Sequence, residues 1–163
     1  MSGSKVLALD ALIATLAPRR AEGRKIALAN GLFDILHVGH LRYLESARRE
    51  ADILVVGVNS NASARRLKGE GRPIVPASER AELVAGFGCV DYVTIFDEET
   101  AERLILALKP DVHCKGTDYL AENVPERAAV LSYGGRVAIV GDPKTHATRD
   151  LIARIATARR KGP

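Results

Sequence analysis

The most informative segment of this sequence is the run Asp52-Ile53-Leu54-Val55-Val56-Gly57-Val58. Every residue after the aspartate is apolar or glycine, and most of them are β-branched. Continuous apolar character is typical of a strand in a parallel sheet, because helices cover both faces of such a sheet. The run therefore predicts a buried strand inside an α/β domain.

Short apolar runs alternate with longer helical patterns on both sides of this segment. Further strands are predicted at residues 25–30, 92–95, 111–114 and 136–140, and helices at about 38–50, 78–86, 99–108, 125–133 and 148–158. We expect Ser78 to cap its helix. Five strands alternating with helices predict a doubly wound parallel α/β sheet, in which ligands bind beyond the carboxyl ends of the strands.

The N-terminal region predicts a leader helix rather than a targeting signal. Leu9, Leu12, Ile13 and Leu16 recur at helical spacing and stop at Pro18, and no small-residue cleavage site follows. The chain divides on this basis into three parts. They are a leader helix (residues 1–23), a single domain (24–158) and a basic C-terminal tail (159–163).

Composition narrows the class of protein further. The 163 residues include 24 Lys and Arg against 20 Asp and Glu, a net charge of +4, with three Phe, four Tyr and no Trp. This charge is compatible with anionic substrates, whereas a nucleic-acid binder needs a dense basic face with exposed aromatics. No apolar run approaches the roughly 18 residues of a membrane span, and Cys89 and Cys114 show no paired spacing. We therefore expect a cytoplasmic protein that binds neither nucleic acid nor membrane.

The segment after the first predicted strand is Asn30-Gly31-Leu32-Phe33-Asp34-Ile35-Leu36-His37-Val38-Gly39-His40. It places His37 and His40 together in the first turn of a helix, where unpaired backbone N–H groups attract anions. Gly39 removes a side chain between them and lets a phosphate approach. The pattern predicts a phosphate site, with two alternatives. The histidines could only cap or pack, or they could bind zinc, although zinc-binding helical pairs are usually spaced i, i+4.

The pattern Asn-Gly-x-Phe-Asp-x-x-His-x-Gly-His resembles the signature of the cytidylyltransferase-like nucleotidyltransferases, also known by their HxGH motif. The likeness extends over roughly residues 7–140. Arg66-Leu67-Lys68-Gly69 and Lys115-Gly116-x-Asp118-Tyr119 are most similar to the D-glycero-β-D-manno-heptose 1-phosphate adenylyltransferases of that family. The resemblance implies a Rossmann-like fold and transfer of AMP from ATP to the heptose 1-phosphate, giving ADP-heptose for lipopolysaccharide and pyrophosphate.

The resemblance also implies a role for each motif residue. His40 would donate to the α-phosphate and His37 would hold the β- and γ-phosphates. Asp34 would orient the site or carry a water of Mg²⁺, which would enter with ATP and have no direct protein ligand. The other implied nucleotide-binding positions are Asn30, Gly31, Phe33, Gly39, Arg72, Gly116, Asp118 and Thr148.

Four cations complete the predicted site. Lys68 and Arg72 lie in a glycine-bearing loop that could close over the triphosphate, or be a solvated basic loop. Arg80 lies in the first turn of a helix, where the dipole disfavours a cation, so we expect it to contact phosphate; an ordinary surface arginine is the alternative. Lys115 follows the fourth strand and would bind the sugar phosphate or the α-phosphate.

One segment departs from the family pattern and leaves the substrates open. Family members carry a Ser-Thr-Thr-like run before the last helix, and here only Thr148 keeps a hydroxyl, although Thr145, His146 and Arg149 could supply other anion contacts. The alternatives are a cytidylyl- or adenylyltransferase for glycerol 3-phosphate, phosphoethanolamine or FMN, and a non-catalytic nucleotide-binding regulator. ATP and a phosphorylated sugar are the expected partners, and the family resemblance favours a homo-oligomer.

Overall fold

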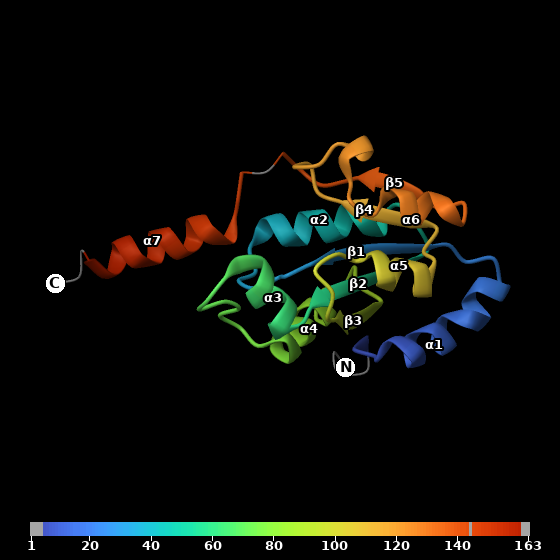
Figure 1. Ribbon diagram of the computed structural model, residues 1–163, viewed down its shortest axis with the longest axis horizontal. Helices are drawn as coiled ribbons and strands as arrows, with labels where there is room; N and C mark the ends of the chain where they lie inside the picture. The colour runs from blue at the N-terminus through green and yellow to red at the C-terminus, as the bar shows by residue number, and fades with distance from the viewer. Residues whose placement is uncertain (1–4, 144, 161–163) are drawn as a thin grey trace.

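The computed structural model describes residues 5–143 and 145–160, and its centre is one sheet of parallel strands (Figure 1). The strands are β1 (Ile26–Gly31), β2 (Ile53–Asn59), β3 (Tyr92–Phe96), β4 (Val112–Lys115) and β5 (Arg136–Ile139). They are arranged in the order β3-β2-β1-β4-β5, and each neighbouring pair is parallel. The doubly wound α/β sheet predicted from the sequence is confirmed.

Helices connect the strands and flank the sheet. They are α1 (Leu9–Ala21), α2 (Val38–Arg48), α3 (Asn61–Lys68), α4 (Ala77–Ala85), α5 (Glu102–Leu108), α6 (Arg127–Ser132) and α7 (Thr148–Arg160), with a 3₁₀ turn at Ala121–Asn123. The predicted start of α5 at residue 99 is wrong, because the side chains of Asn59 and Ser63 hold the carbonyl of Glu98 outside the helix.

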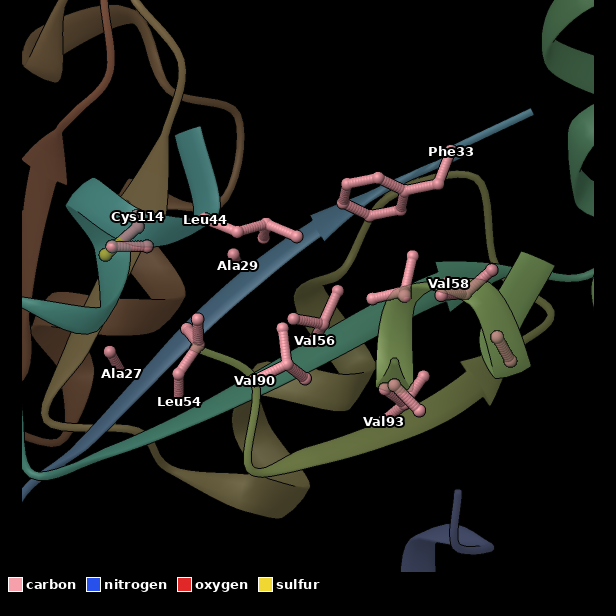
Figure 2. Packing of buried hydrophobic residues seen from close by; sticks show 14 of the residues in the cluster. Ala27, Ala29, Phe33, Leu44, Leu54, Val56, Val58, Val90, Val93 and Cys114 are labelled. Carbon is pink, nitrogen blue, oxygen red and sulfur yellow. The ribbon is translucent and has the colours of Figure 1, made fainter. Parts of the chain in front are cut away.

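The apolar core lies in two layers, one on each face of the sheet. Leu54, Val56 and Val58 of β2 pack with residues of α2 and α4 on one face, part of the cluster drawn in Figure 2. Ile53 and Val55 pack with residues of α1 and α5 on the other face. Because successive side chains of a strand point to opposite faces, a strand covered on both sides is apolar throughout.

The predicted leader helix shares this core. Leu12 and Leu16 of α1 are buried in the same cluster as Ile53 and Val55. The prediction that the helix stops at Pro18 is wrong. A proline inside a helix cannot donate a hydrogen bond, but its carbonyl can still accept one, and here the Pro18 carbonyl accepts from the N–H of Glu22 at 3.1 Å.

The C-terminal helix includes part of the predicted basic tail. Arg159 and Arg160 of the predicted basic tail belong to α7, whereas residues 161–163, like residues 1–4 of the predicted leader, lie outside the described residues. Helix α7 extends away from the sheet in Figure 1, and none of its residues is buried. In the part of the chain that the structure describes, no helix combines the length and the apolar character needed to cross a membrane.

The predicted serine cap of α4 is wrong. The helix begins one residue earlier, after Pro76, and no side chain of the capping residue accepts a hydrogen bond. Instead Oδ1 of Asn61, from α3, accepts a hydrogen bond from the N–H of Ala77 at 2.8 Å. A neighbouring helix therefore satisfies the N-terminal N–H group that the sequence assigned to Ser78.

Candidate active site

A cleft of about 1110 Å³ lies along the carboxyl edge of the sheet. Its walls come from the segments that follow β1, β2, β4 and β5, including Asn30, Lys68, Lys115 and Thr148. This is the edge at which parallel α/β sheets bind ligands. The fold therefore brings predicted site residues from four strand ends to one cleft.

Two histidines form the N-terminus of α2 and line the cleft. His37 is the capping residue, and its Nδ1 accepts a hydrogen bond from the N–H of Gly39 at 3.1 Å. Nδ1 of His40 accepts in turn from the backbone N–H of His37 at 3.2 Å, and the two ring centroids are 4.0 Å apart. Because each Nδ1 accepts, each neutral ring carries its proton on Nε2. Capping, weighed above as an alternative, thus presets both rings as Nε2–H donors.

Gly39 allows this arrangement. A Cβ atom on Gly39 would lie 2.9 Å from Cε1 and Nδ1 of His37, a separation that side chains do not tolerate. The ring of His146 lies on the same side of α2, with its centroid 6.0 Å from that of His37, and lines the cleft. The structure therefore places a third imidazole beside the predicted pair.

Phe33 supports the second histidine. Its backbone φ is 51°, a left-handed conformation that is uncommon outside glycine, and its side chain is buried with the ring centroid 5.4 Å from that of His40. A Cβ on Gly31 would lie 3.2 Å from the Phe33 ring, so the predicted glycine makes room for this ring. Both residues line the cleft as predicted.

Asp34 fixes the loop after α3. Its buried carboxylate accepts hydrogen bonds from Nε of Arg72 at 2.6 Å and from the N–H groups of Ile74 and Val75, each at 2.9 Å. Burial alone would raise the pKa of Asp34, but these hydrogen bonds outweigh it and hold the pKa below its ordinary value of 3.8. Asp34 orients Arg72, which lines the cleft.

Both carboxylate oxygens of Asp34 already accept hydrogen bonds within the protein, and its alternative role, carrying a water of Mg²⁺, stays a prediction. Among the described residues, no three His, Cys, Asp or Glu side chains are grouped to hold a metal. The entry of Mg²⁺ with the triphosphate stays a prediction.

Arg80 requires a correction. Its side chain is fully buried and is not among the residues that line the cleft. Nε donates to the carbonyl of Val75, and Nη1 donates to the carbonyls of Leu32 and Asn59. The guanidinium is also within 3.2 Å of Oδ1 of Asn61. Carbonyl oxygens, rather than a bound phosphate, therefore explain a cation at this helix start, and Arg80 holds the ends of β1 and β2 together.

The other predicted cations line the cleft. Lys68 ends α3 and is exposed, followed by Gly69 at φ 90° where the chain turns into the loop. Lys115 ends β4 and is largely buried, with Nζ 4.5 Å from the ring centroid of Tyr119. Cations from the β2 and β4 sides thus line the same cleft as the two histidines.

The remaining predicted residues also lie at the cleft. A Cβ on Gly116 would lie 3.1 Å from Oδ1 of Asp118, so the glycine permits the turn after β4. Thr148 starts α7 and donates from Oγ1 to the carbonyl of Ile35 at 3.2 Å. Thr145 and Arg149, suggested above as substitutes for the missing hydroxyls, line the cleft with His146.

Two buried residues escaped the sequence reasoning. His113 of β4 is fully buried, with Nε2 2.8 Å from Oδ1 of Asn30. An amide oxygen only accepts, so Nε2 of His113 carries the proton, and burial lowers the pKa of this histidine to about 4. Glu126, just before α6, is buried with Oε2 3.9 Å from Nζ of Lys115. No local pattern marks either residue, because their partners lie in distant segments.

A parallel sheet whose first crossover helix presents two imidazole donors to a cation-lined cleft defines a nucleotidyltransferase. Residues 28–153 match the family described as cytidylyltransferase-like. The chain therefore belongs to the cytidylyltransferase-like nucleotidyltransferases, which confirms the resemblance noted in the sequence.

Relatives with curated names are similar to nearly all of this chain. The bifunctional protein HldE of Geobacter metallireducens is 48% identical over 157 residues, which are 96% of this chain and 32% of that protein. The bifunctional protein HldE of Pseudomonas paraeruginosa is 46% identical over 96% of this chain and 32% of its own length. The chain thus spans about a third of the length of these relatives.

Solved structures give the same fold. The lipopolysaccharide core biosynthesis protein from Thermoplasma volcanium is 30% identical, with a TM-score of 0.62 over 72% of this chain and 95% of that chain. Pantothenate synthetase from Thermus thermophilus is 21% identical, with a TM-score of 0.58 over 88% of this chain and 63% of that one, and shares the fold alone.

Proposed function

We propose that this chain transfers AMP from ATP to a sugar 1-phosphate, D-glycero-β-D-manno-heptose 1-phosphate, to give ADP-heptose and pyrophosphate. The observation that carries the proposal is the pair of Nε2–H donors of His37 and His40 at the N-terminus of α2, in a cleft that Lys68, Arg72 and Lys115 also line. The sugar is proposed from the motif resemblance and from relatives named HldE and a lipopolysaccharide core biosynthesis protein.

The reaction needs no covalent enzyme intermediate. An oxygen of the acceptor phosphate attacks the α-phosphorus of ATP in line. A new P–O bond forms while the bond from the α-phosphorus to the bridging oxygen breaks, and pyrophosphate leaves with that electron pair. Positioning and charge stabilisation therefore supply most of the catalysis.

Each group has a part in this proposal. Nε2–H of His40 donates to a non-bridging α-phosphate oxygen as charge develops there, and His37 donates to the β- and γ-phosphates. Lys68 and Arg72 balance the triphosphate from the β2 side, and Lys115 balances the acceptor phosphate from the β4 side. Mg²⁺ arriving with ATP would neutralise further phosphate charge.

A second candidate keeps the reaction and changes a substrate. It is favoured by the segment 145–149, which lines the cleft with Thr145, His146 and Arg149 in place of a hydroxyl run. CTP, or an acceptor such as glycerol 3-phosphate, phosphoethanolamine or FMN, belongs to this candidate. A non-catalytic regulator is disfavoured because two aligned donors and three cations line one cleft. The cytoplasmic location and the homo-oligomeric state stay predictions.

A nucleotide-by-acceptor panel, read by pyrophosphate release, tests the proposal. We expect ATP with D-glycero-β-D-manno-heptose 1-phosphate and Mg²⁺ to give the highest kcat/KM. Turnover only with another phosphorylated acceptor or another nucleotide would move the function to the second candidate. If no nucleotide and acceptor pair releases pyrophosphate although the protein still binds ATP, the result would favour the non-catalytic regulator.

A further inference from the structure

Glu126 places a buried carboxylate in the wall of the cleft. Only 3% of the residue is exposed, and it lines the cleft beside Lys115. Oε1 accepts a hydrogen bond from the N–H of Ala101 at 3.2 Å. Oε2 receives no hydrogen bond from any residue that the structure describes.

The neighbours of Oε2 do not satisfy it. Nζ of Lys115 lies 3.9 Å away, which is an ion pair but too long for a hydrogen bond, and this ammonium group also lies over the Tyr119 ring. The one ring N–H of neutral His113, on Nε2, donates to Oδ1 of Asn30, so its Nδ1 is an acceptor. A buried carboxylate oxygen with no donor is costly, and native structures rarely leave one in that state. None of the described residues therefore supplies a donor to Oε2.

The chemistry of the site limits what that donor is. A phosphate group would be repelled by the carboxylate itself, and four of the predicted phosphate contacts lie at the start of α2 (His37 and His40), at the end of α3 (Lys68) and in the loop after it (Arg72). The fifth, Lys115, adjoins Glu126. Glu126 instead adjoins the start of α5, through Ala101, and the end of β4. The substrate group that meets Oε2 must be uncharged and must carry a hydrogen-bond donor. A sugar hydroxyl has this chemistry.

We propose that Glu126 is a specificity-determining residue whose Oε2 accepts a hydrogen bond from a sugar hydroxyl of the bound substrate, either the ribose of the nucleotide or the acceptor sugar. The inference rests on the proposed nucleotidyl transfer. Binding of that hydroxyl satisfies the buried oxygen, whereas a substrate without the hydroxyl leaves it unpaired. Discrimination of this kind, in which a site built to bind a hydroxyl rejects the analogue that lacks it, is among the strongest available to an enzyme.

The test compares the wild-type protein with Glu126→Gln and with the matched control Glu99→Gln. Glu99 is an exposed carboxylate in the same cleft, paired with Arg66 at 3.4 Å. Each protein is assayed for pyrophosphate release with ATP, 2′-deoxyATP and 3′-deoxyATP, and with the acceptor and its single-deoxy analogues. We expect one analogue to lower kcat/KM by roughly 10- to 100-fold in the wild type and in Glu99→Gln, and by less than about threefold in Glu126→Gln. The identity of the analogue with this pattern shows whether Oε2 binds a hydroxyl of the ribose or of the acceptor sugar.

Two outcomes overturn the inference. One is an equal loss in the wild type and in Glu126→Gln for every hydroxyl removed. The other is a wild type that no analogue slows by more than about threefold, a result that stands even if Glu126→Gln does not fold. Calorimetric binding of the same ligands separates this test from the function. If no pair releases pyrophosphate, the proposed function fails, and the ratios of Kd between each ligand and its deoxy analogue still decide the role of Glu126.

Discussion

Individual side chains at this site do two things at once. The Nδ1 atoms of His37 and His40 complete the hydrogen bonds of a helix start, and this fixes the tautomer that leaves Nε2–H as the donor. Asp34 likewise satisfies two backbone N–H groups while it orients Arg72. Structural capping and ligand binding are therefore not competing explanations for these residues.

His40→Ala should lower kcat by on the order of 10²-fold or more, because it removes a preset donor to the developing charge. The loss of its capping bond should cost only about 0.5–2 kcal/mol of folding free energy. Pyrophosphate release measures the first effect and urea denaturation the second. Phe87→Leu, at a residue that does not line the cleft, is the control and should keep a near-normal kcat. A near-normal kcat in folded His40→Ala would refute the role of His40.

Asp34→Asn should change how stability depends on pH. The pKa of Asp34 is lowered in the folded state, so its contribution to stability is present above the ordinary value of 3.8 and is lost as the pH falls through the folded-state pKa. The difference in free energy of unfolding between wild type and Asp34→Asn should therefore be largest near neutral pH and shrink under acid conditions. Urea denaturation from pH 7 down to about 3 measures it.

Exposed Asp142, paired with Arg42 at 3.4 Å, provides the control substitution Asp142→Asn. It should show a small, nearly pH-independent difference, because exposed ion pairs contribute little. A pH-independent difference for Asp34→Asn would contradict the pinning of the loop by an ionised carboxylate.

The start of helix α2 depends on the absence of a side chain at Gly39. Glycine in a helix normally costs stability, about 0.5–1 kcal/mol relative to alanine. Here a Cβ on Gly39 would displace the His37 ring, which caps that helix. Glycine is required at position 39 because of its contact with His37 in the same turn. The spacing of the sequence motif was therefore enough to predict this requirement.

Gly39→Ala should leave stability nearly unchanged, since the gain in helix propensity offsets the lost cap, which is worth about 0.5–2 kcal/mol. The KM for ATP should rise and kcat/KM should fall by at least about tenfold, because the His37 ring moves. Gly88→Ala is the matched control, because a Cβ there meets nothing within 4 Å. Wild-type kcat/KM in Gly39→Ala would show that the position of His37 does not matter.

The fold of the whole molecule brings charged residues from distant segments to one cleft. Lys68, Arg72 and Lys115 line it together with carboxylates such as Asp34 and Glu126. Arg80, the fourth cation assigned to this group from the sequence, lies inside the protein and joins Leu32 and Asn59, which line the cleft. The fold as a whole, including α1, holds these segments in place.

Leu12→Ala in α1 should destabilise the entire domain by about 2–5 kcal/mol, because the side chain is fully buried against the sheet. Ile13→Ala, one residue on and 37% exposed, should cost less than about 1 kcal/mol. A single cooperative thermal transition, shifted only in Leu12→Ala, is expected. Separate melting of α1, with the rest unchanged, would instead indicate an independent leader.

Much of the fold and of the site followed from local sequence patterns. The run 52–58 predicted β2 because apolar character on both faces is visible in the residues themselves, and the spacing of His37 and His40 predicted a helix start that binds anions. Element ends were less accurate where another segment supplied the hydrogen bond, as Asn61 does at α4.

Arg80, His113 and Glu126 needed the tertiary structure. Arg80 meets the carbonyl of Leu32, 48 residues away, and His113 meets Asn30, 83 residues away. A buried polar group is defined by its partners, and strand order brings those partners together across long stretches of chain. Periodicity and spacing therefore sufficed for the strands and for the existence of the helices, whereas only the folded arrangement placed Arg80 inside the protein between two strand ends and Glu126 in the wall of the cleft.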